Sequence, residues 1–369
     1  MRILIVKLVS LGDCILVTPT IRALRKKCPN DHITFLTSEP YVDIFRGNKH
    51  IDELKIAPAM NTHWSGGRTI HYYDAVVTRE LQSEHYDKLI ELNTTIFMGE
   101  YRRTGVHMRD HYAEMAGVYP LDNPSYEIPL MGDERNVFWS VFPEEDPDVY
   151  APVVLHTGGG WALKFLPMHQ WFPILKHLNH VLPTNTPVYF VGGSEDALPP
   201  EFVGDVKRVL GDRKFVDMSG KLPLKVLYWL FQRSSLFVGG DSGPMHLASA
   251  ANCSSVVYFT VTSQYVGTPT SSRFVTMQSM DSCSVPCGLV QCGTRTLCAK
   301  TTDPEHINKA IDRLLSAGDA DIQEHYKGDK PSYHYFHQWN HYSLPDPEPA
   351  LSQWVDNRKA LDSSWTPNL

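Results

Sequence analysis

Within the segment 235–251, SLFVGGDSGPMHLASAA, the residue types and their order suit the binding of an anion. An apolar run predicts a buried strand, two glycines allow a sharp turn, and the small residues that follow favour a helix capped by Asp241 or Ser242. The free N–H groups at the start of such a helix attract negative charge, and Ser242 and His246 add side-chain donors. The pattern therefore predicts a phosphate or pyrophosphate pocket at the carboxyl end of a parallel strand. An ordinary strand–helix junction is the alternative.

A second glycine-rich loop follows another expected strand. Thr157, Gly158 and Gly159 come directly after the apolar run 152–156, and Lys164 follows a few residues later. Glycines permit a close approach of the backbone to a ligand, and a lysine can meet a phosphate as a point charge. We therefore expect this loop to lie against the same anion, with an ordinary surface lysine as the alternative for Lys164.

An acidic pair follows a third expected strand. Glu195 and Asp196 come after the apolar run 187–191, two glycines and a serine. A carboxylate at such a strand end commonly accepts hydrogen bonds from the vicinal hydroxyl groups of a ribose. We predict that Glu195, with Asp196 close behind, holds the ribose of a nucleotide.

Near the N-terminus, Asp13 is the carboxylate placed for proton transfer. It follows the strand-like run 2–6 and precedes a segment, 14–27, that we expect to be helical. A carboxylate at the end of the first strand faces the crevice of an α/β protein, where it can take a proton from an acceptor hydroxyl. For this residue alone, a helix N-cap is the alternative. The loop SLGD lacks the G-x-G-x-x-G pattern, which argues against an NAD-dependent dehydrogenase or epimerase.

Three of these segments resemble the signatures of glycosyltransferase family 9, the heptosyltransferase family. They are GDSGPMH at 240–246, KLVSLGDCILVTPTIRALRKKCPNDHITFLT at 7–37 and HTGGGWALKFLPMHQW at 156–171. The resemblance extends over residues 1–315 and implies the GT-B fold, in which two doubly wound Rossmann-like α/β domains face each other across a crevice. The implied reaction is an inverting, metal-independent transfer of a sugar from a nucleotide-diphosphate sugar to a hydroxyl group. Heptose from ADP-heptose is the expected case.

The resemblance also implies roles for individual residues of this chain. Asp13 would be the catalytic base. The donor would be bound by Ser10, Gly12, Thr157, Gly158, Gly159, Lys164, Glu195, Leu222, Asp241, Ser242, Gly243, Pro244 and His246. A short helical stretch near the acceptor would contribute His107, Arg109 and Asp110, for which a solvated helix face is an equal alternative.

Four of the seven cysteines are clustered, at Cys283, Cys287, Cys292 and Cys298. Short loops can bring four thiolates to one point, so the group is a candidate for a structural zinc or iron that takes no part in catalysis. Two disulfides are disfavoured in a cytosolic protein, and free thiols in a packed loop are the other alternative. The spacing is not a repeated C-x-x-C, so the sequence leaves the choice open.

The order of the expected elements predicts two domains and a tail. Residues 1–145 form the acceptor-side Rossmann-like domain, and residues 146–318 form the nucleotide-sugar-binding domain, which includes the cysteine cluster. Residues 61–79 are expected to be a loop on the acceptor side. Residues 319–369 carry aromatic residues without a period, and we expect this tail to pack back on the protein or on a neighbouring subunit of a homo-oligomer.

Length and composition limit the class of protein. The 369 residues are 42% hydrophobic and 20% charged, which is typical of a globular protein with two cores. A net charge of -7 provides no basic field, so we expect no nucleic-acid partner. The N-terminal apolar run is too short for a signal peptide and no stretch is long enough to cross a bilayer, so the expected location is cytoplasmic. Peripheral contact with a membrane stays open.

The expected partners are a nucleotide-diphosphate sugar and an acceptor of undetermined class. A glycan such as the lipopolysaccharide core, another lipid-linked glycan and a protein side chain all fit the sequence. The alternative function is a non-catalytic nucleotide-sugar-binding or assembly protein of the same fold. Asp13, Lys164 and Asp241 argue against that alternative, because a protein without transfer activity needs no base.

Overall fold

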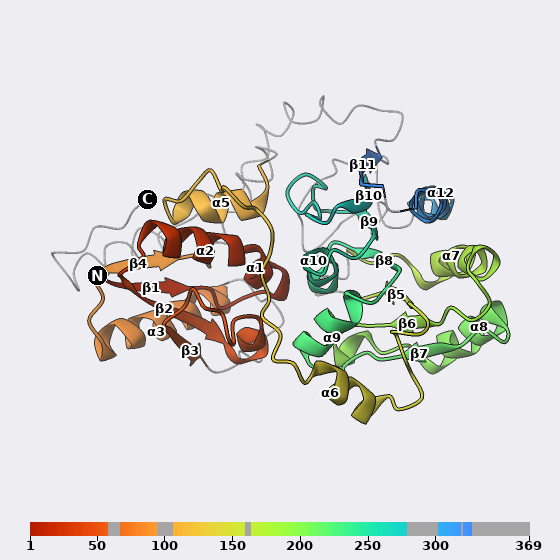
Figure 1. Ribbon diagram of the computed structural model, residues 1–369, viewed down its shortest axis with the longest axis horizontal. Helices are drawn as coiled ribbons and strands as arrows, with labels where there is room; N and C mark the ends of the chain where they lie inside the picture. The colour runs from red at the N-terminus through yellow and green to blue at the C-terminus, as the bar shows by residue number, and fades with distance from the viewer. Residues whose placement is uncertain (58–66, 94–105, 159–163, 279–301, 319, 327–369) are drawn as a thin grey trace. The chain divides into compact units, whose positions relative to one another are not determined.

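The computed structural model describes residues 1–57, 67–93, 106–158, 164–278, 302–318 and 320–326. For residues 67–74 it describes the backbone alone. All of these residues belong to one compact unit, Met1–Gly328, which contains two parallel sheets with helices packed against them (Figure 1). Among the helices described, none is both long and apolar enough to cross a membrane.

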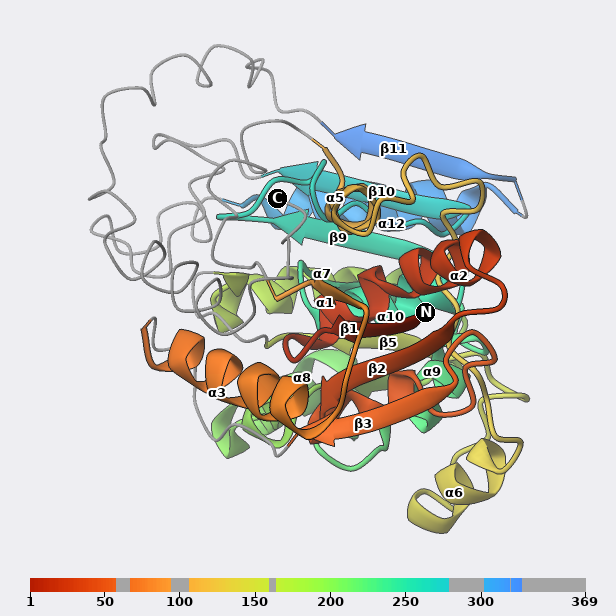
Figure 2. The ribbon, with the colours of Figure 1, turned by 90° about the vertical axis from the view of Figure 1, so that its left-hand side faces the viewer.

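The first sheet has four parallel strands in the order β3-β2-β1-β4. Figure 2 shows β3, β2 and β1 side by side. The strands are β1 (Arg2–Val6), β2 (His32–Ser38), β3 (Glu53–Ala57) and β4 (Lys88–Glu91). The helices of this half are α1 (Leu11–Leu16), α2 (Thr18–Lys27), the 3-10 helix η1 (Glu39–Ile44), α3 (Gly67–Ser83) and α5 (Met108–Met115). Ile3 and Ile5 of β1 pack into one apolar cluster, and Leu4 and Val6 pack into another. Because both faces of β1 are covered, its sequence is continuously apolar.

Two expectations for this half need correction. The helix expected at 14–27 is two helices separated at Val17, because Pro19 lacks an N–H group and stands in the first turn of α2. The loop expected at 61–79 is helical from Gly67 onward, as part of α3. Val77 of this helix is fully buried in the cluster beneath β1, so an apolar face holds the helix on the sheet.

The second sheet has seven parallel strands in the order β11-β10-β9-β8-β5-β6-β7. The strands are β5 (Val153–His156), β6 (Val188–Phe190), β7 (Phe215–Asp217), β8 (Leu236–Gly240), β9 (Ser255–Phe259), β10 (Arg273–Gln278) and β11 (Ile322–Tyr326). Its helices are α7 (Met168–Val181), the 3-10 helix η4 (Ser194–Asp196), α8 (Pro200–Leu210), α9 (Leu224–Phe231), α10 (Gly243–Ala250) and α12 (Pro304–Ser316). Helix α6 (Glu134–Val141) lies in the sequence between the strands of the first sheet and those of the second. Strand β11 pairs with β10, so the sheet continues into the segment 319–369 that we expected to be a tail.

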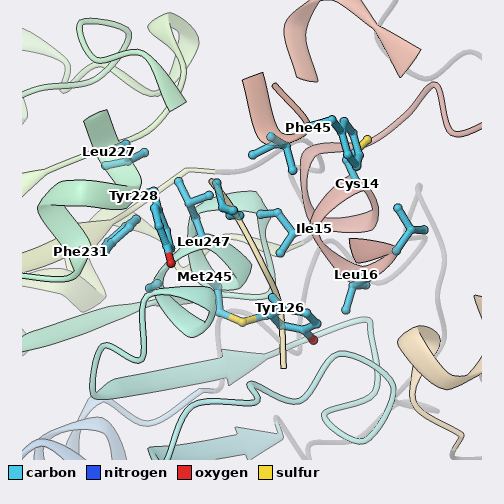
Figure 3. Packing of buried hydrophobic residues seen from close by; sticks show 14 of the residues in the cluster. Cys14, Ile15, Leu16, Phe45, Tyr126, Leu227, Tyr228, Phe231, Met245 and Leu247 are labelled. Carbon is cyan, nitrogen blue, oxygen red and sulfur yellow. The ribbon is translucent and has the colours of Figure 1, made fainter. Parts of the chain in front are cut away.

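A shared apolar cluster joins the two halves where α1 meets α10 (Figure 3). The cluster contains Ile15 of α1, Met245 and Leu247 of α10, and Tyr228 of α9. Two glycines allow the helices to approach closely. A Cβ atom on Gly12 would lie 2.6 Å from the His246 ring, and one on Gly243 would lie 2.7 Å from the Leu11 side chain. The packing therefore brings the starts of both helices to one place.

Candidate active site

A pocket lies where the starts of α1 and α10 meet. The first half contributes Ser10, Gly12, Asp13, Leu16 and Met108, and the second half contributes Lys164, Asp241, Ser242, Gly243, His246, Thr262, Ser263, Val266 and Gly267. The pocket thus brings the predicted base and most of the predicted phosphate-binding residues together from segments far apart in the sequence.

The Asp13 carboxylate is held from both sides. Its Oδ1 accepts a hydrogen bond from the Tyr112 hydroxyl at 2.6 Å, and its Oδ2 accepts one from the Ser10 hydroxyl at 2.9 Å. Ser10 is the N-cap residue of α1, so Asp13 stands in the first turn of the helix and is not its cap. A carboxylate in the first turn of a helix is favoured by the helix dipole.

A buried lysine behind Tyr112 controls the charge of this carboxylate. Lys7 is 0% exposed, and its Nζ donates to the Leu92 carbonyl at 2.8 Å and to the Tyr112 hydroxyl oxygen at 3.1 Å. Burial by itself raises the pKa of Asp13, but the positive charge of Lys7 and the hydrogen bond from Tyr112 outweigh it. The net pKa of Asp13 is below its ordinary value, so the carboxylate is ionised and able to accept a proton.

The start of α10 has the geometry of an anion site. Ser242 is the N-cap residue in an extended conformation, but its side chain makes no capping hydrogen bond to the helix. The N–H groups of the first turn are therefore not satisfied by that side chain, and Ser242 and Gly243 at this helix start line the pocket. The sequence left the cap between Asp241 and Ser242, and the structure assigns it to Ser242.

Asp241 holds Lys164 and Thr262 in place. Its Oδ2 accepts from Lys164 Nζ at 2.7 Å and from Thr262 Oγ1 at 2.6 Å, and its Oδ1 lies 3.7 Å from His246 Nε2. Burial alone raises the pKa of Asp241, whereas the charge of Lys164 and the contact with His246 lower it, and the net pKa is far below the usual range. Asp241 therefore stays ionised and fixes Lys164 beside the start of α10.

Several predicted donor residues lie outside the lining of this pocket. Thr157 is buried after β5, Glu195 is exposed on η4, and Leu222 packs against the apolar cluster between the halves. Gly158 follows Thr157, and Pro244 is in the first turn of α10. Gly159 lies outside the residues that the structure describes, so its role stays a prediction.

One of the predicted acceptor residues, His107, joins the two halves. His107 caps α5, where its Nδ1 accepts from the Arg109 N–H at 3.1 Å and its Nε2 donates to the Thr268 carbonyl at 2.8 Å. Burial lowers the pKa of His107 to about 4, which agrees with a neutral ring. The Arg109 side chain makes two hydrogen bonds to Asp110, at 2.8 and 3.1 Å. Arg109 is thus already paired in this structure.

The predicted metal site falls on Cys283, Cys287, Cys292 and Cys298, which lie outside the described residues. In the part of the chain that is described, no group of three or more His, Cys, Asp or Glu side chains could hold a metal ion.

Sequence reasoning missed four residues of the site. Three of them form hydrogen bonds with side chains that line the pocket: Tyr112 with Asp13, His156 with Ser242, and Thr262 with Asp241. The fourth, Lys7, forms a hydrogen bond with Tyr112. A charged residue directly after the apolar strand 2–6 was a signal for Lys7. Tyr112 and Thr262 carried no local signal, because their partners are remote in sequence.

Comparison with known proteins identifies the fold and finds a family match over part of the chain. Residues 119–293 match the sequence model of "Glycosyltransferase family 9 (heptosyltransferase)". A family 9 glycosyltransferase from Veillonella parvula is 22% identical with a TM-score of 0.68, over 85% of this chain and 97% of that chain. The ADP-heptose lipopolysaccharide heptosyltransferase II of E. coli is 16% identical with a TM-score of 0.60, over 85% and 98%. The iron-containing dodecameric glycosyltransferase TibC from enterotoxigenic E. coli is 14% identical with a TM-score of 0.56, over 85% and 78%.

No curated protein matched the sequence. The structural likeness confirms the predicted fold class, a GT-B arrangement of two parallel α/β sheets. The sequence match indicates a glycosyltransferase, because residues 119–293 correspond to a family 9 glycosyltransferase domain.

Proposed function

We propose that this chain is an inverting glycosyltransferase with Asp13 as its base and a nucleotide-diphosphate sugar as its donor. The observation that carries the proposal is the pocket that holds Asp13 from one sheet beside the start of α10 and Lys164 from the other. An acceptor hydroxyl at Asp13 and a pyrophosphate at α10 would place the anomeric carbon between them, as displacement from the opposite face requires.

In the proposed reaction the Asp13 carboxylate takes the proton of the acceptor hydroxyl. The acceptor oxygen forms a bond to the anomeric carbon while the bond from that carbon to the donor phosphate oxygen breaks. The electron pair of that bond leaves with the nucleoside diphosphate. Attack from the face opposite the leaving group inverts the configuration at the anomeric carbon.

The developing charge on the nucleoside diphosphate would be met by groups of this chain. Lys164 and the N–H groups of the first turn of α10 supply positive charge that is already in position, which is how preorganised sites stabilise a transition state. We therefore propose that the transfer needs no cofactor and no metal ion. Glu195 is proposed to accept hydrogen bonds from the ribose hydroxyl groups.

Heptose from ADP-heptose is the proposed substrate. The support is the resemblance to the heptosyltransferase family and the likeness to a structure described as an ADP-heptose lipopolysaccharide heptosyltransferase. The proposed acceptor is a hydroxyl of a glycan, a lipid-linked glycan or a protein.

Replacing Asp13 with Asn tests the proposed base. Asp13→Asn keeps the size of the side chain but removes the proton-accepting charge, so we expect turnover to fall by a factor of about 10² to 10⁴. Binding of ADP, measured by isothermal titration calorimetry, should stay close to that of the wild type. Weaker ADP binding with intact turnover would contradict the assignment.

A thermal-shift panel of ADP, UDP, GDP and their sugars tests the donor. A ligand that binds the native state at one hundred times its Kd adds about 2.7 kcal/mol to the free energy of unfolding, so the correct nucleotide raises the Tm. We expect ADP and ADP-heptose to give the largest rise, and EDTA to leave that rise unchanged. A flat response to every nucleotide would refute the donor site.

We further propose a structural zinc or iron at Cys283, Cys287, Cys292 and Cys298, since thiolates are suitable ligands for either ion. A structural neighbour of this chain is described as iron-containing. EDTA alone should then lower the Tm, and elemental analysis should find one of these metals. Protein that contains neither metal and has an unchanged Tm would rule the site out.

A further inference from the structure

A buried histidine connects two loops around the proposed donor site, and the transfer chemistry described above does not use it. His156 ends β5 and is 1% exposed. Its Nδ1 lies 3.0 Å from Ser242 Oγ, at the start of α10, and its Nε2 lies 3.3 Å from Asp196 Oδ2, at the end of η4.

The hydrogen bonds around Ser242 determine the role of the ring. The Ser242 hydroxyl has two neighbours, the Gly240 carbonyl at 3.1 Å and His156 Nδ1 at 3.0 Å. These two contacts fix the position of its oxygen. The Asp196 carboxylate can only accept, so Nε2–H donates to it. The ring thus bridges Asp196 and Ser242.

Asp196 is itself fixed by its surroundings. Its Oδ2 also accepts from the Gly193 N–H at 2.9 Å. A Cβ atom on Gly158 would lie 1.8 Å from Asp196 Oδ1, so the carboxylate is packed directly against the glycine loop after β5. Asp196 therefore holds His156 from a rigid position.

We propose that His156 is a positioning residue for the donor: held by Asp196, it keeps Ser242 Oγ at the mouth of the anion site. When a phosphate oxygen arrives at the start of α10, it then meets a hydroxyl whose oxygen His156 already holds in place. This inference rests on the proposed donor site. It also divides the two acids of η4, because Asp196 acts through His156 and Glu195 stays available for the ribose.

Asparagine and glutamine at position 156 separate the two ring contacts. The amide nitrogen of Asn lies close to the position of Nδ1, whereas that of Gln lies close to the position of Nε2. We expect His156→Ala and His156→Gln to weaken ADP binding by about tenfold, the loss of one hydrogen bond to an anion site. His156→Asn should keep the affinity for ADP within about threefold of the wild type.

A double-mutant cycle with Ser242→Ala tests the proposed partner. If His156 acts through Ser242, the variant with both alanines binds ADP about as well as Ser242→Ala alone. His177→Ala is the control, since it removes another His–Asp pair, 2.8 Å from Asp312, between α7 and α12. ADP binding to this control should equal that of the wild type, and the Tm of each variant is measured first without ligand.

The outcomes distinguish this inference from the proposed function. Additive losses in the double variant, or equal losses for Asn, Gln and Ala at position 156, overturn the positioning role while the donor site stands. A wild-type protein that binds neither ADP nor inorganic pyrophosphate overturns the donor site and this inference with it. Rescue by Asn together with coupling to Ser242 supports the positioning role, because a merely structural histidine would give neither.

Discussion

The carboxylate of Asp13 illustrates how neighbours decide whether a buried acid can act as a base. Burial alone raises its pKa, and without compensation a raised pKa would leave it protonated. Lys7 compensates with a positive charge that is itself fully buried. Burial and the nearby carboxylate raise the pKa of Tyr112 well above its usual value. The Tyr112 hydroxyl therefore stays protonated and donates to Asp13. The proposed base is thus ionised at neutral pH and has a fixed orientation.

The substitution Tyr112→Phe should change the pH profile of the enzyme. It removes a hydrogen bond that lowers the pKa of Asp13, so the acidic limb of kcat/KM should move to higher pH. Because one of the two side-chain hydrogen bonds that orient Asp13 is also lost, kcat on the plateau should fall by about three- to tenfold. Tyr258→Phe, which changes a buried tyrosine of β9 in the other core cluster, is the control. An acidic limb that moves to lower pH would contradict this account.

The pKa of Asp13 also affects stability. Because its folded-state pKa is lowered, the group contributes stability that is fully present above its unfolded pKa and is lost as the pH falls through the folded value. Tyr112→Phe raises the folded-state pKa of Asp13 toward its unfolded-state pKa. The stability of this variant should therefore decline at a higher pH than that of the wild type.

Helices α1 and α10 need small residues where they cross. A methyl group on Gly12 would lie 2.6 Å from the His246 ring, and that ring lines the pocket. The glycine in SLGD is therefore explained by packing against the other half of the molecule. The same approach places Asp13 at the pocket, so the packing of these two helices and the geometry of the site are linked.

We expect Gly12→Ala to lower the free energy of unfolding by about 1–3 kcal/mol, because the site is overpacked. It should also weaken ADP binding, since His246 must move. The matched control is Gly204→Ala on the exposed side of α8, where no atom lies within 4 Å of the new methyl group. That control should gain about 0.5–1 kcal/mol of stability from helix propensity. Urea unfolding measures both, and a stable Gly12→Ala variant would refute the close approach.

The two sheets share one of their apolar clusters, although each has its own strand order. The cluster that contains Ile15 of α1 and Leu247 of α10 spans both halves, while Trp171 belongs to a cluster of the second sheet alone. Further contacts cross between the halves. The Met108 N–H donates to the Val266 carbonyl at 3.0 Å, and Lys225 Nζ donates to the Arg46 carbonyl at 2.7 Å. This continuity predicts that both halves unfold together.

Calorimetry should therefore show one main transition for the two halves. Leu247→Ala removes a fully buried side chain from the shared cluster and should cost about 2–5 kcal/mol without splitting the transition. Leu315→Ala, at a position 38% exposed on α12, is the control and should change stability by about 0.5 kcal/mol or less. Two separate transitions in the wild type would show that the shared cluster does not couple the halves.

The sequence alone determined the features that depend on neighbouring residues. Apolar runs located β1, β5, β8 and β9, and GDSGPMH located the turn and the helix start of the proposed anion site. It was less successful at helix boundaries and over Gly67–Ser83, where histidines and glycines concealed the apolar face of α3. Such local patterns carry the periods of helices and strands and the residues of turns, so they can be interpreted without a partner.

Only the tertiary structure decided which side chains surround those features. Tyr112 reaches Asp13 across 99 residues of sequence, and His156 reaches Ser242 across 86. It also separated Asp196, turned toward His156, from Glu195, exposed on the same short helix. The physical reason is that the charge and orientation of a buried group depend on whatever packs within a few ångströms of it, and chain topology sets that neighbourhood.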